Sequence, residues 1–328
     1  NILNNGYFVG ESQLLTEKDR LVIPVPLYHC FGMVMGTLGC VTKGAAMVFP
    51  GEGFDATSAL QAVAGERCTG FYGVPTMFVA MLDHADFKRF DVTSLRTGIM
   101  AGAPCPIEVM KRVVSDLHMP EVTIAYGMTE TSPVSFQSHV DDPLEKRVST
   151  VGRIHPHVEV KVIDEQGAAL SAGEIGEICL RSPANMTGYW NRPEATAETI
   201  IDGWLHTGDI AMIDADGFIY IQDRIKDMII SGGENVYPAE IERVLLSHPD
   251  VIDAAVVRAF DAKWGESPVA FVACDDDGPD AEALLNLCRE SLAGYKRPRE
   301  IHFIAFEDFP RSTSGKIQRH ILEARLAD

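Results

Sequence analysis

Residues 68–84 have the sequence CTGFYGVPTMFVAMLDH, in which a short apolar run meets a proline and then a second apolar segment. The first part predicts a buried strand and the second a helix, because proline is favoured in the first turn of a helix. The same alternation continues on both sides: helices are predicted at 54–66 and 106–117, and strands at 94–102 and 121–127. Short apolar strands between helices are typical of a parallel or mixed α/β layer.

Ligands of such sheets usually bind at the loops that follow the carboxyl ends of the strands. Here those loops contain AGAP (101–104) and YGMTE (126–130). In the second, Tyr126 could stack on a base, the Thr129 hydroxyl could contact a phosphate, and Glu130 could hold Mg²⁺ on phosphate oxygens. A plain loop is the alternative interpretation of so short a motif.

Two further patterns follow along the chain. From about 151, apolar and polar residues alternate between Gly- and Asp-rich turns, which predicts antiparallel strands in a small β-barrel or a second sheet. From about 225, strands and helices form an α+β unit of ordinary domain size. We therefore expect an α/β and α+β protein with a large domain at 1–150, its β-subdomain at 151–224, and a small carboxyl-terminal domain at 225–328.

Composition excludes several classes of partner and location. The formal charge is −19, so no electrostatic surface for nucleic acid or anionic lipid is expected. The seven cysteines are scattered and never spaced as CxxC, which favours a reducing, cytoplasmic compartment over a disulfide framework or a zinc site. The most apolar segment, 31–49, contains Lys43 and several glycines, so it predicts a buried helix and a strand rather than a membrane span.

Other motifs carry candidate functional residues, although each also has an ordinary structural interpretation. WLHTGD (204–209) places Asp209 after a predicted turn, where it could accept hydrogen bonds from ribose hydroxyls. HPH (155–157) is interpreted as two surface histidines in a turn rather than a metal site. The remaining motifs are PLYHCFG (26–32) with His29, DRIKDMIISGGENVYPAEIE (223–242), LAGYKRPREI (292–301), and RSTSGKIQR (311–319) with Lys316.

Taken in this order, the motifs resemble the adenylate-forming (acyl-CoA synthetase, AMP-binding) superfamily, and most of all its fatty acyl-CoA ligase branch with the medium-chain members. The resemblance implies an ATP-dependent reaction. A carboxylic acid first attacks the α-phosphate of ATP to give acyl-AMP and pyrophosphate, and coenzyme A then takes the acyl group as a thioester. Expected ligands are therefore the acid, ATP, Mg²⁺ and coenzyme A.

The resemblance also implies roles for individual residues. Lys316 would bridge the carboxylate and the α-phosphate, Thr129 would contact that phosphate, Glu130 would bind Mg²⁺, and His29 would border the acyl carboxylate. The small domain would rotate about Lys226 between the two steps. The AMP site would comprise Gly102, Ala103, Pro104, Ala125, Tyr126, Gly127, Met128, Asp209 and Arg224, and the coenzyme A site Gly232, Gly233, Trp264, Lys296 and Arg297.

One departure from the superfamily pattern is the glycine- and hydroxyl-rich phosphate loop, which the sequence lacks. The chain is therefore expected to be an amino-terminally truncated form with little adenylation activity by itself, and to expose apolar surface that favours association, including homo-oligomers. Three other functions stay open: a non-catalytic AMP- or CoA-binding module, an aryl-CoA ligase, and a luciferase-type enzyme. The length of the acyl chain cannot be read from the sequence.

Overall fold

The computed structural model describes residues 1–103, 105–274, 278–312 and 315–326. The chain divides into two compact units, which are described here one at a time. The first unit comprises Asn1–Thr207 and Ala211–Ile221, and the second comprises Gly208–Ile210 and Gln222–Asp328. Helices and sheets occur in both units, which confirms the predicted α/β and α+β class.

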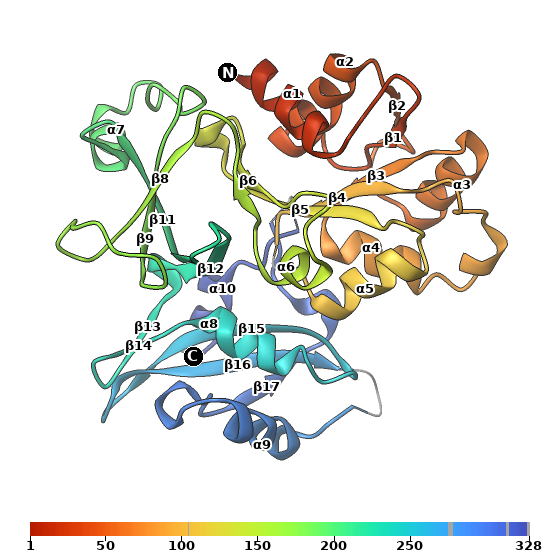
Figure 1. The fold of residues 1–328 in the computed structure, drawn as a ribbon. Helices are drawn as coiled ribbons and strands as arrows, with labels where there is room; N and C mark the ends of the chain where they lie inside the picture. Colours follow the sequence, from red (N-terminus) through yellow and green to blue (C-terminus); the bar gives the residue numbers. More distant parts are fainter. Residues whose placement is uncertain (104, 275–277, 313–314, 327–328) are drawn as a thin grey trace. The chain divides into compact units, whose positions relative to one another are not determined.

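The first unit is built on a seven-stranded sheet with the order β2-β1-β3-β4-β5-β6-β7 (Figure 1). The first five strands in this order are parallel, and β6 and β7 are antiparallel to their neighbours. The mixed α/β layer expected from the sequence is thus confirmed. The strands are β1 Arg20–Val22, β2 Ala46–Val48, β3 Gly70–Gly73, β4 Thr97–Ala101, β5 Glu121–Gly127, β6 Val134–Gln137 and β7 Arg153–Ile154.

Helices cover both faces of this sheet, which explains why strands β3 and β4 are buried along their whole length. Phe71 of β3 packs in one core cluster and its neighbour Tyr72 in another, on opposite faces of the sheet. One face is covered by α3 Ala56–Glu66, α4 Pro75–Leu82, α5 Ile107–Ser115 and α6 Leu144–Ser149. The other is covered by α1 Ile2–Ser12, the π-helix Phe31–Leu38 and α2 Gly39–Lys43.

The most apolar segment forms short elements inside this layer. Residues 31–49 contain the π-helix, α2 and strand β2, as the expectation of a helix followed by a strand required. Among the residues that the structure describes, no helix combines the length and hydropathy needed to cross a membrane.

A second sheet belongs mostly to the first unit, and its residues 208–210 and 222–224 belong to the second unit. The sequence left open a barrel or a second sheet, and the structure has a five-stranded sheet with the order β10-β11-β9-β8, in which β12 pairs with β11. Its apolar face packs around Ile178, Leu180 and Phe136, the last of which comes from β6. The elements are β8 Glu159–Ile163, β9 Ile175–Arg181, α7 Pro193–Thr199, β10 Ile200–Ile201, β11 Trp204–Ile213 and β12 Ile219–Arg224.

The second unit is a sheet with the order β14-β13-β16-β15, and β17 pairs with β16. Helices α8 and α9 cover one face around Ile241 and Leu284, while Leu322 of α10 and Phe309 pack on the other. The elements are β13 Ile229–Ser231, β14 Glu234–Val236, α8 Pro238–Leu245, β15 Val251–Asp261, β16 Gly265–Cys274, α9 Ala281–Ser291, β17 Ile301–Phe303 and α10 Arg319–Arg325.

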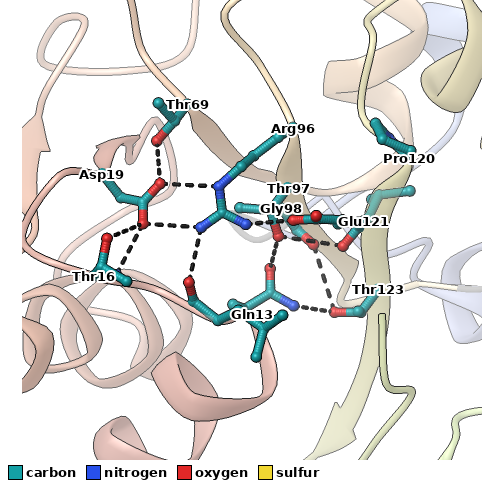
Figure 2. Close-up of polar contacts among 12 residues, drawn as sticks. Gln13, Thr16, Asp19, Thr69, Arg96, Thr97, Gly98, Pro120, Glu121 and Thr123 are labelled. Atoms are coloured by element: carbon teal, nitrogen blue, oxygen red, sulfur yellow. Dashed lines mark hydrogen bonds and ion pairs between the residues drawn. The ribbon is translucent and has the colours of Figure 1, made fainter. Parts of the chain in front are cut away.

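A polar network ties the amino-terminal ends of β1, β3, β4 and β5 together (Figure 2). The Asp19 carboxylate accepts hydrogen bonds from Arg96 Nη2 at 2.9 Å, Thr69 Oγ1 at 2.7 Å and the Thr16 backbone N–H at 2.8 Å. Arg96 also donates to Glu121. The Asp19 side chain is only 5% exposed, so these donors replace water almost completely.

We expect Asp19→Asn to lower the free energy of unfolding at pH 7 by about 2–3 kcal/mol, because it leaves Arg96 without its most buried counter-charge. Burial raises the pKa of Asp19, but hydrogen bonds from Arg96 and Thr69 outweigh it and hold the pKa below its usual range. The ionised form is therefore stabilised by folding. Its contribution is complete above the unfolded value of about 3.9 and is lost as the pH falls through the lower folded pKa.

Urea unfolding at pH 7 and pH 3 would test this. The matched control is Asp86→Asn, because Asp86 pairs with Arg89 on the surface, where such pairs contribute about 1 kcal/mol or less. A pH-independent difference between the wild type and Asp19→Asn would contradict the electrostatic explanation.

Candidate active site

The loops after β4 and β5 lie side by side, as parallel neighbours require. Ala101 pairs with Ala125 at the carboxyl ends of the two strands. Exposed Gly102 and Ala103 follow β4, and Gly102 has a φ of +91°, a conformation that favours glycine. Pro104 lies outside the described residues. The structure therefore brings together the AGA and YGMTE segments that the sequence predicted as one site.

The end of β5 is shaped by a close backbone approach at Gly127. A Cβ atom at this position would lie 1.9 Å from the carbonyl oxygen of Pro133, so the turn excludes every other residue. Thr129–Thr131 then form a 3₁₀ turn, closed by the Thr131 N–H donating to the Met128 carbonyl at 3.0 Å. Thr129 is exposed at this turn, where its hydroxyl can meet a ligand.

Glu130 is oriented by a residue that the sequence did not single out. The Tyr189 hydroxyl donates to Glu130 Oε1 at 2.7 Å, and the Met186 N–H donates to the Glu130 carbonyl at 2.7 Å. Burial, and then the hydrogen bond to Glu130, raise the pKa of Tyr189, so the phenol stays a proton donor. Tyr189 is 59 residues from Glu130 in the sequence, so no local pattern could have indicated this contact.

Tyr126 is stacked within the protein. Its ring lies 5.2 Å from that of Phe136 with an interplanar angle of 16°. Ala125 beside it is buried. Phe136 therefore fixes the plane of the Tyr126 ring, so a base stacking on Tyr126 would adopt a defined orientation.

His29 and Cys30 lie beside the same turn. Cys30 Sγ is 3.9 Å from Thr129 Oγ1 and 3.8 Å from His29 Nδ1. The Phe31 N–H donates to His29 Nδ1 at 3.1 Å, so in neutral His29 the proton is on Nε2. The structure thus joins the predicted His29 to the Thr129 turn and adds Cys30, which the sequence missed.

Asp209 and Arg224 form a pair within the second unit. Arg224 Nε lies 3.3 Å from Asp209 Oδ1, and the aspartate side chain is 12% exposed against 49% for the arginine. The expectation that Asp209 follows a turn was wrong, because residues 204–213 form the continuous strand β11. The sequence Thr-Gly-Asp suggested a turn, whereas Gly208 has a φ of +70° inside the strand.

The predicted hinge residue lies directly after β12. Lys226 belongs to the short 3₁₀ turn Ile225–Asp227 and is exposed. Its carbonyl accepts a hydrogen bond from the Arg258 guanidinium. This backbone contact fixes the turn to strand β15.

The glycine turn between β13 and β14 packs against Trp264. Gly232 and Gly233 have φ values of +62° and +88°, and a Cβ on Gly232 would lie 2.6 Å from the Trp264 ring. Two cations that the sequence missed lie near this ring: Lys263 Nζ at 4.4 Å and the Arg299 guanidinium carbon at 5.9 Å from its centroid. The structure therefore groups three of the predicted coenzyme A contacts.

The other two predicted contacts of coenzyme A make hydrogen bonds inside the protein. Lys296 Nζ donates to both carboxylate oxygens of Glu240 at 2.9 and 2.7 Å. Arg297 donates to the carbonyls of Leu292 and Arg289 at 2.9 and 3.0 Å, at the end of α9. A ligand phosphate would have to share these cations with their present partners.

The Lys316 loop is anchored on both sides. Lys316 is exposed, and its carbonyl accepts a hydrogen bond from the Ser312 N–H at 2.8 Å. On one side Arg311 pairs with Asp253, and on the other Arg319 Nη2 donates to the Glu242 carboxylate at 2.7 and 2.8 Å. All of these residues belong to the second unit. The ends of the loop are thus fixed to the sheet and helices of that unit.

The interpretation of HPH as two surface histidines was half wrong. His157 is exposed, but His155 is 5% exposed and its Nε2 lies 3.0 Å from Gln137 Oε1. Its Nδ1 is buried without a hydrogen-bond partner among the described residues. Burial, and then the charge of His139, lower the pKa of His155 from 6.5 to about 4.

We therefore expect His155 to destabilise the fold in mild acid. Below pH 6.5 the unfolded chain takes up a proton that the folded chain accepts only near pH 4, so up to about 3 kcal/mol is lost between these values. His155→Gln, which cannot titrate, should flatten this part of the stability profile in chemical unfolding. His157→Asn is the control, and an equal flattening in both variants would contradict the assignment.

Comparison with known proteins shows which protein family the chain is similar to. The model of the AMP-binding enzyme family matches residues 1–190, and that of the AMP-binding enzyme C-terminal domain matches residues 240–316. Both matched segments contain residues of the candidate site.

Individual relatives agree with these matches. The acyl-CoA ligase sidI of Aspergillus fumigatus is 43% identical, and the mitochondrial medium-chain acyl-CoA ligase ACSF2 of Danio rerio 42%. They align with 100% and 99% of this chain, which spans 59% and 54% of their own lengths. The solved structure of the anthranilate CoA ligase AuaEII with anthranoyl-AMP has a TM-score of 0.90 at 30% identity, over 99% of this chain and 63% of that one.

Proposed function

Because the chain belongs to the AMP-binding enzyme family, we propose that it works as an ATP-dependent acyl-CoA ligase that activates a fatty acid, of medium chain length as for the ACSF2 relative. The observation that carries the proposal is the cluster at the carboxyl end of β5. There the Thr129 hydroxyl lies 3.9 Å from Cys30 Sγ, next to His29 in the chain, and Glu130 follows Thr129 in the same turn. The neighbouring strand β4 ends at Ala101, which pairs with Ala125 of β5. Hydroxyl, carboxylate and imidazole groups at such a sheet edge suit a phosphorylated ligand and an acid.

In the first step, a carboxylate oxygen of the acid attacks the α-phosphorus of ATP, and the bond to pyrophosphate breaks. Negative charge then accumulates on the non-bridging oxygens. We assign the Thr129 hydroxyl and the Lys316 ammonium as donors to these oxygens, because groups aimed at developing charge lower the barrier most. Glu130 fits Mg²⁺, which prefers carboxylate oxygens and, when bound, neutralises phosphate charge.

In the second step, the sulfur of coenzyme A attacks the acyl carbon, and AMP leaves with the bonding electrons. We assign Asp209, held by Arg224, to the ribose hydroxyls, and His29 to the acyl carboxyl group. Ala125–Met128 with Gly102–Pro104 would surround the adenine. Gly232, Gly233 and Trp264, with Lys296 and Arg297, would contact coenzyme A.

We propose that the small carboxyl-terminal domain at 225–328, which carries the lysine loop, rotates about Lys226 between the two steps. Arg311 and Arg319 fix both ends of this loop within the second unit. Lys316 would therefore move together with that unit rather than as an independent loop. None of the seven cysteines, all of which lie among the described residues, forms a disulfide, and this supports a place in a reducing compartment such as the cytoplasm.

Binding of a sulfamoyl analogue of octanoyl-AMP to the 328-residue chain, measured by calorimetry, tests the assignment of the site. Thr129→Val should weaken binding about tenfold or more, since hydrogen bonds to charged groups contribute about 1.5–3 kcal/mol. Thr93→Val is the control, because the Thr93 hydroxyl donates to Asp91 in an exposed turn to which no site role is assigned. Equal affinities of wild type and Thr129→Val would remove Thr129 from the site.

Turnover is measured in the complemented protein, in which this chain replaces its counterpart in the sidI ligase. Thioester and AMP formation across acids of increasing length would support the proposal and identify the acid, and a preference for aromatic acids would indicate an aryl-CoA ligase. Binding without pyrophosphate exchange would indicate a non-catalytic AMP- or CoA-binding module, and light emission a luciferase-type enzyme. The 328-residue chain by itself is expected to show little exchange.

A further inference from the structure

A cluster of three metal-ligating side chains lies on the second sheet, and none of the three is assigned to the candidate active site. Glu177 and Cys179 come from β9, and His206 comes from its neighbour β11. Residues two apart on a strand face the same side of a sheet, so Glu177 and Cys179 both point toward the face that His206 shares. One carboxylate oxygen, one sulfur and one imidazole nitrogen lie within 4.8 Å of one another.

We propose that Glu177, Cys179 and His206 form a binding site for a thiophilic divalent transition metal of the Zn²⁺ class, with the remaining coordination position open to solvent. Thiolate, imidazole and carboxylate are the three protein ligands that Zn²⁺ takes in tetrahedral sites. The site would join β9 to β11 through side chains in addition to the backbone hydrogen bonds of the sheet.

The distances fit such a centre. His206 Nδ1 lies 3.7 Å from Cys179 Sγ and 2.9 Å from Glu177 Oε2. With ordinary Zn–S, Zn–N and Zn–O bond lengths at tetrahedral angles, these separations would be about 3.6 Å and about 3.4 Å. Small side-chain rotations would therefore bring these two pairs to the separations of a bound ion, and the Cys179 sulfur and a Glu177 carboxylate oxygen lie within 4.8 Å of each other.

Protons satisfy this cluster less well than a metal does. Nδ1 of His206 can donate its proton to Glu177 Oε2 or accept the thiol hydrogen of Cys179, but it cannot do both. A metal ion accepts an electron pair from all three atoms at once. Cys179 is fully buried, while the Glu177 and His206 side chains are 19% and 21% exposed, so the cluster has a buried sulfur and an approach from solvent.

Two nearby positive charges oppose a cation. The Arg181 guanidinium carbon lies 4.6 Å from the centre of the Trp204 ring, and this arginine pairs with Glu159. Lys161 of β8 is the direct cross-strand partner of Cys179. Its ammonium lies 4.6 Å from the centre of the Trp204 ring, where the ring face stabilises the charge. Glu159 offsets the charge of Arg181, and the negative charges of Glu177 and of a metal-bound thiolate exceed the charge of Lys161, so the cluster still favours a divalent ion.

Titration of the metal-free 328-residue chain with Co²⁺ tests the site, because a Co²⁺–thiolate bond gives a charge-transfer absorption band that nitrogen and oxygen ligands do not give. We expect a band that saturates at one Co²⁺ per chain and is displaced by Zn²⁺. Cys179→Ser should abolish the band. Loss of an outer-shell partner of a metal ligand weakens metal binding about 10- to 100-fold. Glu177→Gln and His206→Gln remove a ligand itself, so each should weaken Zn²⁺ binding by at least this factor.

Two control variants distinguish this centre from adventitious binding. Cys30→Ser removes a partly exposed thiol next to a histidine, and His302→Gln removes a histidine that pairs with Glu300 at 3.3 Å without a thiol. Both should keep the band and the affinity. The proposal is overturned if the folded wild type gives no thiolate band at millimolar Co²⁺, or if Cys179→Ser keeps it. Should Cys179→Ser not fold, equal Zn²⁺ affinities of His206→Gln and His302→Gln overturn it.

Discussion

Lys316→Ala is expected to lower acyl-AMP formation in the complemented protein by about 10²–10³-fold, the loss typical of removing a donor to developing negative charge. The thioester step from supplied acyl-AMP should change little, since no new charge then develops at phosphorus. Pyrophosphate exchange reports the first step, and coenzyme A acylation from synthetic acyl-AMP reports the second. The difference between the two losses is the diagnostic quantity.

The matched control for this prediction is Lys111→Ala. Lys111 is an exposed lysine of α5 whose ammonium pairs with Glu108, and no role at the site is assigned to it. Both of its half-reactions should match wild type. If Lys316→Ala slowed both half-reactions equally, the lysine would act in binding or folding, and its assignment to the α-phosphate would be withdrawn.

Arg319→Met should destabilise the second unit by about 3–5 kcal/mol, the cost of leaving a buried charge without its partner. Glu242 is 6% exposed, and its carboxylate also accepts a hydrogen bond from the Val256 N–H at 2.8 Å. Hydrogen exchange of peptides from β15 and α10 measures the effect within that unit. Arg325→Met is the control, because Arg325 is on the same helix and donates to the carbonyl of exposed Asp308.

The effect of Arg319→Met should also depend on pH. Burial raises the pKa of Glu242 and Arg319 opposes that rise, so the variant raises the pKa further. A carboxyl group with a raised folded pKa stabilises the fold fully below its unfolded value of about 4.3 and loses this contribution as the pH rises. The loss should therefore be largest at neutral pH and shrink in acid. Adding Glu242→Gln should restore part of the stability, and no restoration would contradict the mechanism.

The local pattern of apolar residues was sufficient to predict the strands and helices of the central layer of the first unit. The segments 68–74 and 75–84 became β3 and α4, and the strands predicted at 94–102 and 121–127 became β4 and β5. Apolar runs bounded by Gly or Pro decide between helix and strand within a few residues, so no distant contact was needed. The adjacency of the loops after β4 and β5 then followed from parallel pairing.

Features set by distant contacts could not be predicted. His155 is buried because Gln137 and the ring of Phe8 meet it from other elements. Cys30 and Thr129 are in contact although they are 99 residues apart in the sequence. Arg319 and Glu242 likewise pair although they are 77 residues apart. The sequence around each of these side chains carries no pattern that predicts its partner, because the contact forms only when the sheets are assembled.

The interleaved boundary of the two units limits how the protein can be dissected. Residues 208–210 belong to the second unit although they precede the last part of the first, so the chain passes between units three times. A single proteolytic cut at 221–222 would therefore not release an intact carboxyl-terminal fragment. A fragment starting at Gln222 would lack Asp209, and the Arg224 guanidinium would lose the carboxylate that it contacts at 3.3 Å.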